Sequence, residues 1–168
     1  HLDRPEPPGQ TMRGGTQIPD NLFSNPSDLT AVVKEKISKA VTEYLGGLEQ
    51  DPDHPFLRYL NMRFRFTGAW STILHGSGYD GSHLHNEGWI SGVYYVKVPD
   101  LSEDRWEAGE GCIQLGEPPE NFVSERNQAK RLIRPEPGMT VLFPSYYWHG
   151  VRPFEEKGLR HSIAFDII

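Results

Sequence analysis

The spacing of apolar residues changes along the chain, and it first predicts one amphipathic helix over residues 26–48. Apolar side chains recur there every three or four residues, as on one face of a helix. They are Leu29, Val32, Val33, Ile37, Ala40, Val41, Tyr44, Leu45 and Leu48. Asn25 followed by Pro26 is typical of a helix start, and Gly46 and Gly47 are typical of its end. We expect this helix to pack with one face on a sheet.

From residue 58 onward the apolar period shortens to two, which predicts strands. RYLNMRFRF alternates large apolar and polar residues, and AWSTILH continues the pattern after Gly68. Further segments are short, rich in β-branched and aromatic residues, and bounded by Gly or Pro. These are WISGVYYVKVP, GCIQLGE, AKRLIRPE, MTVLFPS and LRHSIAFDII. Residues 101–111 and 117–128 are expected to be loops.

Several short strands behind one helix, without alternating helical crossovers, indicate a mainly β fold. The pattern favours an antiparallel sandwich or jelly roll over a parallel α/β sheet. The 168 residues suit a single domain, 1–168. Within it we expect an extended arm at residues 1–25, rich in Pro and Gly, then a flanking helix at 26–48 and a barrel at 58–168.

Composition narrows the classes of function. The net charge of −6, with both signs mixed along the chain, argues against nucleic acid as a partner. No apolar run approaches about 18 residues, so no membrane span is expected, and HLDRPEPPGQ has no signal-peptide pattern. One cysteine, Cys112, rules out an internal disulfide and suits a reducing, cytoplasmic setting. The first residue is not Met, which is compatible with a piece of a longer chain.

Candidate metal ligands gather around GSHLHNEGW. His83 and His85 are two residues apart beside a predicted strand, so their side chains are expected on one face. His85 and Glu87 form an equally well-spaced pair. His149, which closes the run MTVLFPSYY, can supply a third ligand from a distant strand. Two neighbouring ligands plus a later histidine resemble a facial triad, which in its usual form holds non-haem iron(II) with two histidines and a carboxylate.

A candidate anion anchor follows eleven residues after His149. Arg160 and Ser162 share one face of a strand whose other residues are mostly Leu, Ile, Ala and Phe. An unpaired guanidinium among core residues is costly, so it calls for an anion in bidentate contact, and the serine can add a hydrogen bond. An internal ion pair with Asp166 is the structural alternative.

These motifs together resemble a known family. HxH followed by GWxSGVYYVxxP, then PxxGxxxLFPSxxxHGVxP and RxSIAFD, is similar to a branch of the iron(II)/2-oxoglutarate-dependent oxygenases. The segments GGTQIPDNLF and WSTIL share the likeness, which covers most of the chain and is most specific over residues 83–99 and 137–166. The resemblance implies a double-stranded β-helix (jelly roll), Fe(II), 2-oxoglutarate as co-substrate, and hydroxylation of an organic substrate with release of succinate and CO₂.

The resemblance also implies roles for individual residues. His149 takes the place of the distal histidine, and Arg160 with Ser162 that of the motif gripping the distal carboxylate of 2-oxoglutarate. Tyr95 stands where related hydroxylases place a tyrosine on the same carboxylate.

Two sets of residues could supply the two metal ligands besides His149. His83 and His85 agree with the branch motif, which favours them. His85 and Glu87 would restore two histidines and a carboxylate, which suits the chemistry of iron better.

The resemblance indicates only general classes of substrate and partner. We expect a small-molecule or peptidyl substrate, no nucleic acid or membrane partner, and a chain compatible with a homodimer. Two other functions fit the same residues. One is a three-histidine cupin-type dioxygenase or isomerase, and the other is a non-catalytic ligand-binding barrel.

Overall fold

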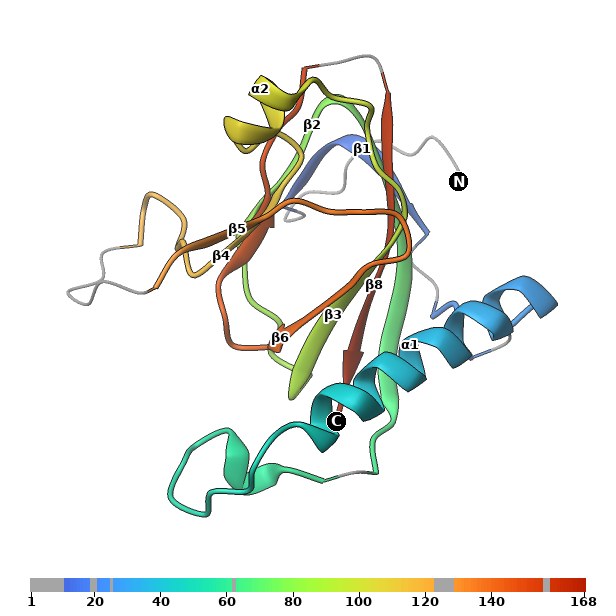
Figure 1. Ribbon diagram of the computed structural model, residues 1–168, viewed down its shortest axis with the longest axis vertical. Coiled ribbons are helices and arrows are strands. Elements are labelled where there is room, and N and C mark those ends of the chain that lie inside the picture. The colour runs from blue at the N-terminus through green and yellow to red at the C-terminus, as the bar shows by residue number, and fades with distance from the viewer. Residues whose placement is uncertain (1–10, 19–20, 25, 62, 123–128, 156–157) are drawn as a thin grey trace.

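The computed structural model describes residues 11–18, 21–24, 26–61, 63–122, 129–155 and 158–168, which contain eight strands and three helices (Figure 1). The strands are β1 (Met12–Ile18), β2 (Phe66–His83), β3 (Ile90–Lys97), β4 (Ile113–Leu115), β5 (Arg131–Ile133), β6 (Thr140–Pro144), β7 (His149–Val151) and β8 (Leu159–Ile167). The helices are α1 (Asp28–Gly46), α2 (Glu103–Glu107) and the 3₁₀ helix η1 (Leu57–Tyr59). No helix among the described residues is long and apolar enough to cross a membrane.

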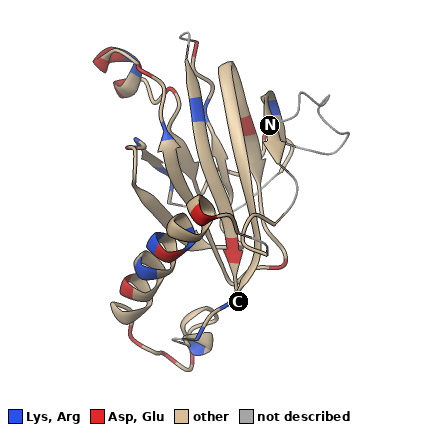
Figure 2. Ribbon diagram, turned by 90° about the vertical axis from the view of Figure 1, so that its right-hand side faces the viewer, with Lys and Arg blue, Asp and Glu red and all other residues tan. Residues whose placement is uncertain are grey.

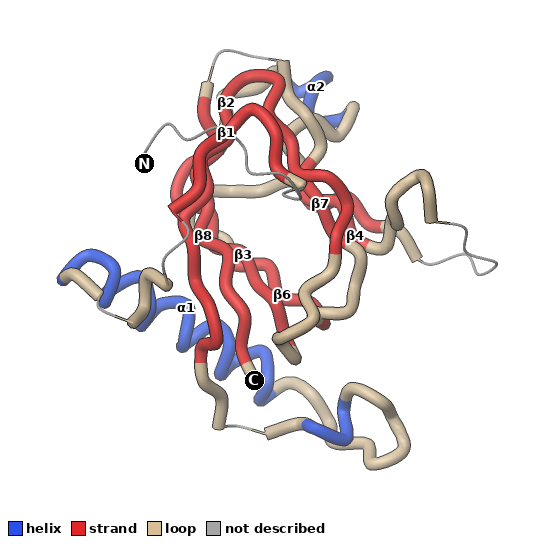
Figure 3. Tube along the Cα trace, turned by 180° about the vertical axis from the view of Figure 1, so that it is seen from behind, coloured by secondary structure: helices blue, strands red, loops and turns tan. Residues whose placement is uncertain are grey.

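All eight strands belong to one antiparallel sheet that curls on itself. Its order is β5-β4-β7-β2-β8-β3-β6, with β1 paired to β2 off this path. β2 serves both halves, because Phe66–His75 pairs with β8 whereas Asp80 and His83 pair with β7. Between these segments Ser77 has a φ of 67°, a left-handed conformation that redirects the strand. The resulting half-closed ring (Figure 3) is the predicted jelly roll.

Helix α1 covers the outer face of the half of the sheet that contains β8. Its buried residues Ile37, Val41 and Leu45 belong to one hydrophobic cluster with Ile163 and Phe165 of β8. The expected packing of this helix on a sheet is therefore present. The helix begins at Asp28, two residues later than predicted. Its N-cap is Ser27, whose hydroxyl accepts a hydrogen bond from the Thr30 amide and so satisfies a donor of the first turn.

Alternation along β8 separates the outer core from the interior of the barrel. Ile163, Phe165 and Ile167 belong to the cluster under α1, whereas Arg160 and Ser162 on the opposite face line a cavity inside the barrel. Lys, Arg, Asp and Glu gather along α1 and in the loops, and the strands carry few of them (Figure 2). A charged residue on an inner strand face is therefore exceptional here.

The structure corrects the prediction for residues 1–25. Met12–Ile18 form strand β1, hydrogen-bonded to β2, rather than an unpacked arm. Glycines allow this pairing, because a Cβ at Gly15 would lie 2.5 Å from the Ile73 carbonyl oxygen. Residues 1–10 of the predicted arm lie outside the described residues.

Two more element predictions are wrong. RYLNMRFRF was expected to be a strand, but η1 ends at Tyr59 and β2 begins only at Phe66. The loop expected at 101–111 contains α2, whose Trp106 is buried in the core at one end of the barrel. In both places tertiary packing overrides local pattern.

Candidate metal and 2-oxoglutarate site

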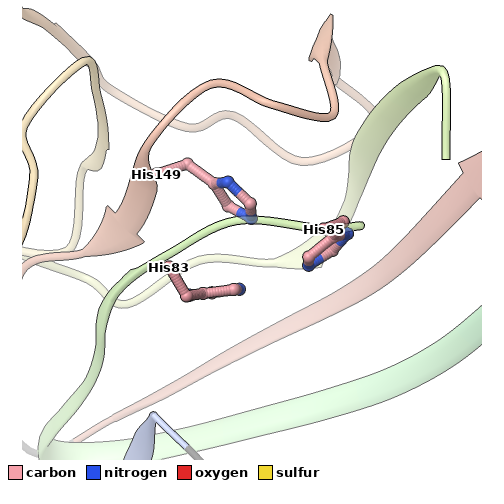
Figure 4. Close-up of side chains that lie close together, drawn as sticks. All are labelled: His83, His85 and His149. Atoms are coloured by element: carbon pink, nitrogen blue, oxygen red, sulfur yellow. The ribbon is translucent and has the colours of Figure 1, made fainter. Parts of the chain in front are cut away.

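Three histidines from two strand ends converge inside the curled sheet (Figure 4). His83 is the last residue of β2 and His149 the first of β7, and the two are directly paired across the strands. His85 lies two residues beyond β2. One potential ligand atom from each ring lies within 4.8 Å of the other two. This is the set that the sequence favoured over the one containing Glu87, and the pairing of β2 with β7 brings His83 and His149 together.

Hydrogen bonds fix how each ring is turned. Nδ1 of His83 lies 2.8 Å from the Gly81 carbonyl oxygen, and Nδ1 of His149 lies 3.0 Å from that of Tyr147. Nδ1 of His85 lies 2.7 Å from a carboxylate oxygen of Asp166. These oxygen atoms accept, so Nδ1 of each ring donates and Nε2 is the nitrogen left to bind a metal. Such acceptors on the far side of the ring are typical of metal-binding histidines.

Burial favours the uncharged form of His149. His149 is buried, and desolvation together with nearby His83 lowers its pKa to about 3. A neutral imidazole is the form that binds metal. Three imidazole ligands suit Fe(II) or another first-row divalent ion.

Glu87, the alternative ligand, lies elsewhere. It is exposed in the bend between β2 and β3 and lines a surface pocket with Tyr59, Arg63 and Trp89. The group of potential metal ligands found among the described residues comprises His83, His85 and His149 without it. The chain leaves strand geometry after His83, so the two-residue spacing no longer keeps Glu87 on the same face as His85.

Arg160 is buried and has hydrogen-bond donors without partners among the described residues. Its side chain is 2% exposed, and Nη1 donates to Ser162 Oγ at 3.2 Å. Nε and Nη2 are buried and have no hydrogen-bond partner among the described residues. The alternative pairing with Asp166 does not occur in the structure, because Asp166 is engaged by His85 and Ser91. A buried guanidinium with two unused donors calls for an anion.

Tyr95 lies beside this guanidinium. It is fully buried, its ring faces Arg160, and its hydroxyl has no hydrogen-bond partner among the described residues. Burial raises the pKa of Tyr95, so its hydroxyl remains a donor at neutral pH. The three predicted anchor residues are therefore close together, because both Ser162 and Tyr95 contact the guanidinium of Arg160.

One cavity joins the histidines to the anchor. His83, His85 and His149 line it together with Arg160 and Ser162. Residues that sequence reasoning did not select complete the wall, notably Trp70, Thr72 and Phe143. Inward alternation along β2 could have indicated Trp70 and Thr72, but the same alternation is found in any half-buried strand. The arrangement can hold a divalent metal at one end and an oxyanion at the other, which fits Fe(II) and 2-oxoglutarate.

Fold and site thus define a jelly-roll protein equipped for iron and a dicarboxylate. Comparison with protein families agrees: residues 68–166 match the family described as "Putative 2OG-Fe(II) oxygenase". The chain belongs to this family of Fe(II)- and 2-oxoglutarate-dependent oxygenases, which are oxidoreductases. No curated protein matches the sequence.

Solved structures share the fold at low sequence identity. OsALKBH1 has a TM-score of 0.56 and 10% identity, covering 97% of this chain and 83% of that one. HygX from Streptomyces hygroscopicus, with nickel and 2-oxoglutarate bound, has a TM-score of 0.55 and 11% identity, covering 96% and 72%. A Pseudomonas putida prolyl-4-hydroxylase has a TM-score of 0.51 and 16% identity, covering 96% and 76%. This chain spans 47% of a longer 2OG-Fe(II) oxygenase family oxidoreductase from Burkholderia pseudomallei (12% identity, 66% of this chain, TM-score 0.48).

Proposed function

We propose that His83, His85 and His149 hold Fe(II), that Arg160, Ser162 and Tyr95 bind the distal carboxylate of 2-oxoglutarate, and that the enzyme hydroxylates an organic substrate. One observation carries the assignment. Three imidazoles with free Nε2 atoms share a cavity with Arg160, a buried guanidinium that has two unused donors among the described residues.

The chain's own residues position the reactants and exclude water. Iron and 2-oxoglutarate, when bound, would activate O₂, so that one oxygen atom enters a substrate C–H bond and the other enters succinate as 2-oxoglutarate loses CO₂. Arg160 neutralises the distal carboxylate, and its contact with Tyr95 and Ser162 holds the guanidinium in one orientation. Trp70 and Phe143 wall the cavity with apolar surface, which limits water near the metal.

The substrate is proposed to approach over the paired strands β1 and β2. A second pocket there is lined by Thr11, Gln17 and Leu84, and it shares Trp70, Thr72, Asp80 and His83 with the metal cavity. Because the two share these residues, we propose this pocket as the entrance to the metal. We propose a small-molecule or peptidyl substrate, consistent with relatives named as a prolyl hydroxylase and as HygX with hygromycin B bound. A cytoplasmic location is proposed from the free thiol of Cys112. A homodimer is also proposed.

Anaerobic reconstitution tests the proposal. Adding Fe(II) and then 2-oxoglutarate to the parent protein is expected to produce a metal-to-ligand charge-transfer band, and admitting O₂ is expected to release succinate. His149→Ala should lose stoichiometric iron, whereas Glu87→Gln should retain it. Iron content that is unchanged in His149→Ala, or lost in Glu87→Gln, would contradict the ligand set. A parent protein that binds iron without producing the band would contradict the 2-oxoglutarate site.

A further inference from the structure

A buried carboxylate lies one ring away from the proposed metal position. Asp166, on β8, accepts a hydrogen bond from His85 Nδ1 at 2.7 Å and another from Ser91 Oγ at 2.6 Å, both at Oδ1. Asp166, Ser91 and Ser145 are all buried, and the Ser91 and Ser145 hydroxyls lie 2.9 Å apart. Ser91 thus holds the carboxylate in place, and Ser145 contacts Ser91 from behind.

The chain leaves almost no room around this carboxylate. A Cβ at Gly88 would lie 3.2 Å from Asp166 Oδ1 and 2.5 Å from Ser145 Oγ. The Gly88 backbone therefore covers the pair at close range. A carboxylate enclosed in this way interacts more strongly with its neighbours than one in water, because few solvent dipoles screen it.

Asp166 contacts the back of a ligand rather than the metal position. Its Oδ1 is bonded to Nδ1 of His85, so the ring lies between the carboxylate and the free Nε2. The hydrogen bond sets the ring orientation and tautomer and makes the imidazole a stronger electron donor. Asp166 also does not form an ion pair with Arg160, whose Nη1 donates to Ser162 Oγ.

The histidine site has a charge deficit that this carboxylate can offset. Two histidines and a carboxylate give a site one negative charge, whereas three neutral imidazoles give none. Asp80 adds a second carboxylate near the site, with Oδ1 3.8 Å from His83 Nδ1 and buried without a hydrogen-bond partner among the described residues. Negative charge therefore lies just outside the ligands.

We propose that Asp166 is a positioning residue that supplies, through His85, the negative charge that a ligand carboxylate gives in two-histidine sites. This inference rests on the proposed assignment of His83, His85 and His149 as ligands. It predicts that Asp166 tunes both the affinity for Fe(II) and the Fe(III)/Fe(II) potential, since a nearby negative charge stabilises the ferric ion more than the ferrous one.

The test compares the parent with Asp166→Asn, which keeps the shape and an acceptor oxygen but removes the charge. Fe(II) affinity is measured by anaerobic competition with a chelator, and the potential by spectroelectrochemistry. We expect Fe(II) binding to weaken by about 10- to 100-fold and the potential to become more positive. Asp53→Asn, at an exposed turn, is the matched control and should leave both unchanged. Circular dichroism of the metal-free proteins checks the fold.

Ser91→Ala provides a second test should Asp166→Asn fail to fold. Removing this donor leaves more charge on the Asp166 oxygen, so the potential should move in the negative direction, opposite to Asp166→Asn. Potentials unchanged in the folded variants would overturn the inference, as would weaker iron binding in Asp166→Asn without a shift in potential. Failure of the ligand assignment appears separately, as iron binding retained in His149→Ala.

Discussion

The guanidinium of Arg160 lies over the ring of Tyr95, with its Cζ atom 4.8 Å from the ring centroid. The pair is enclosed by the barrel, and both side chains have unused hydrogen-bond donors among the described residues. A stacked, desolvated guanidinium is held rigidly, so little entropy is lost when an anion binds to it.

Replacing Arg160 by Met should separate ligand binding from folding. Losing hydrogen bonds between charged groups costs about 1.5–3 kcal/mol, so the dissociation constant of 2-oxoglutarate should rise about 10- to 100-fold. The thermal midpoint of the ligand-free protein should stay the same or rise, because a buried charge is replaced by an apolar chain. Anaerobic titration and thermal unfolding measure the two effects. Arg131→Met, at an exposed position, is the control, and 2-oxoglutarate affinity equal to that of the parent would refute the anchor.

Tyr95→Phe should have a smaller effect of the same kind. Loss of one neutral donor costs about 0.5–1.5 kcal/mol, which corresponds to a roughly 2- to 10-fold weaker affinity for 2-oxoglutarate. Turnover at saturating 2-oxoglutarate should be unchanged. The free energy of unfolding without ligand should not fall, since the hydroxyl has no partner to lose among the described residues. Denaturant titration and initial rates at several 2-oxoglutarate concentrations test this, and a marked loss of stability would indicate a structural role.

Helix α1 should contribute to stability through its buried face. Ile37 is fully buried against the sheet, so Ile37→Ala should lower the free energy of unfolding by about 2–5 kcal/mol. Val32→Ala, on the same helix at a position 50% exposed, should change it by less than about 0.5 kcal/mol. Urea unfolding of the two variants measures the difference, and equal effects would show that the helix is not packed as described.

Two glycines should respond oppositely to alanine. A Cβ at Gly92 of β3 would lie 2.6 Å from Cε2 of the buried Phe165 ring and 2.8 Å from Leu142 Cδ2. Gly92→Ala should therefore destabilise by about 1–3 kcal/mol. Gly46, at the end of α1, has no atom within 4 Å of its Cβ position, so Gly46→Ala should be neutral or stabilise by up to about 1 kcal/mol. Thermal unfolding compares them, and a stable Gly92→Ala would mean that β3 packs less closely on β8.

Much of the fold and of the anion anchor could be predicted from the alternation of side chains along strands. Arg160 and Ser162 stand two residues apart in an apolar segment, and a strand places such residues on one face whatever its partners are. The same rule failed for RYLNMRFRF, because alternation indicates how a strand would be buried but not whether a neighbouring strand exists to pair with it. Residues 12–18 show the converse: a Gly-rich segment with weak strand character becomes β1 because β2 offers a free edge.

The choice between His83 and Glu87 as the partner of His85 could not be made from residue spacing. Each stands two residues from His85, so spacing alone treats them alike. The structure separates them because β2 ends at His83, paired with His149, and the chain then bends and carries Glu87 to the surface.

The sequence by itself determined the mainly β fold, the packed helix, and the residue types needed for metal and carboxylate. These follow from periodicity and side-chain chemistry, which are local properties. Tertiary structure alone decided which candidate ligands meet and that Asp166 bonds to His85 instead of Arg160. Those outcomes depend on the register between strands distant in sequence, and register follows from how the whole sheet curls and packs.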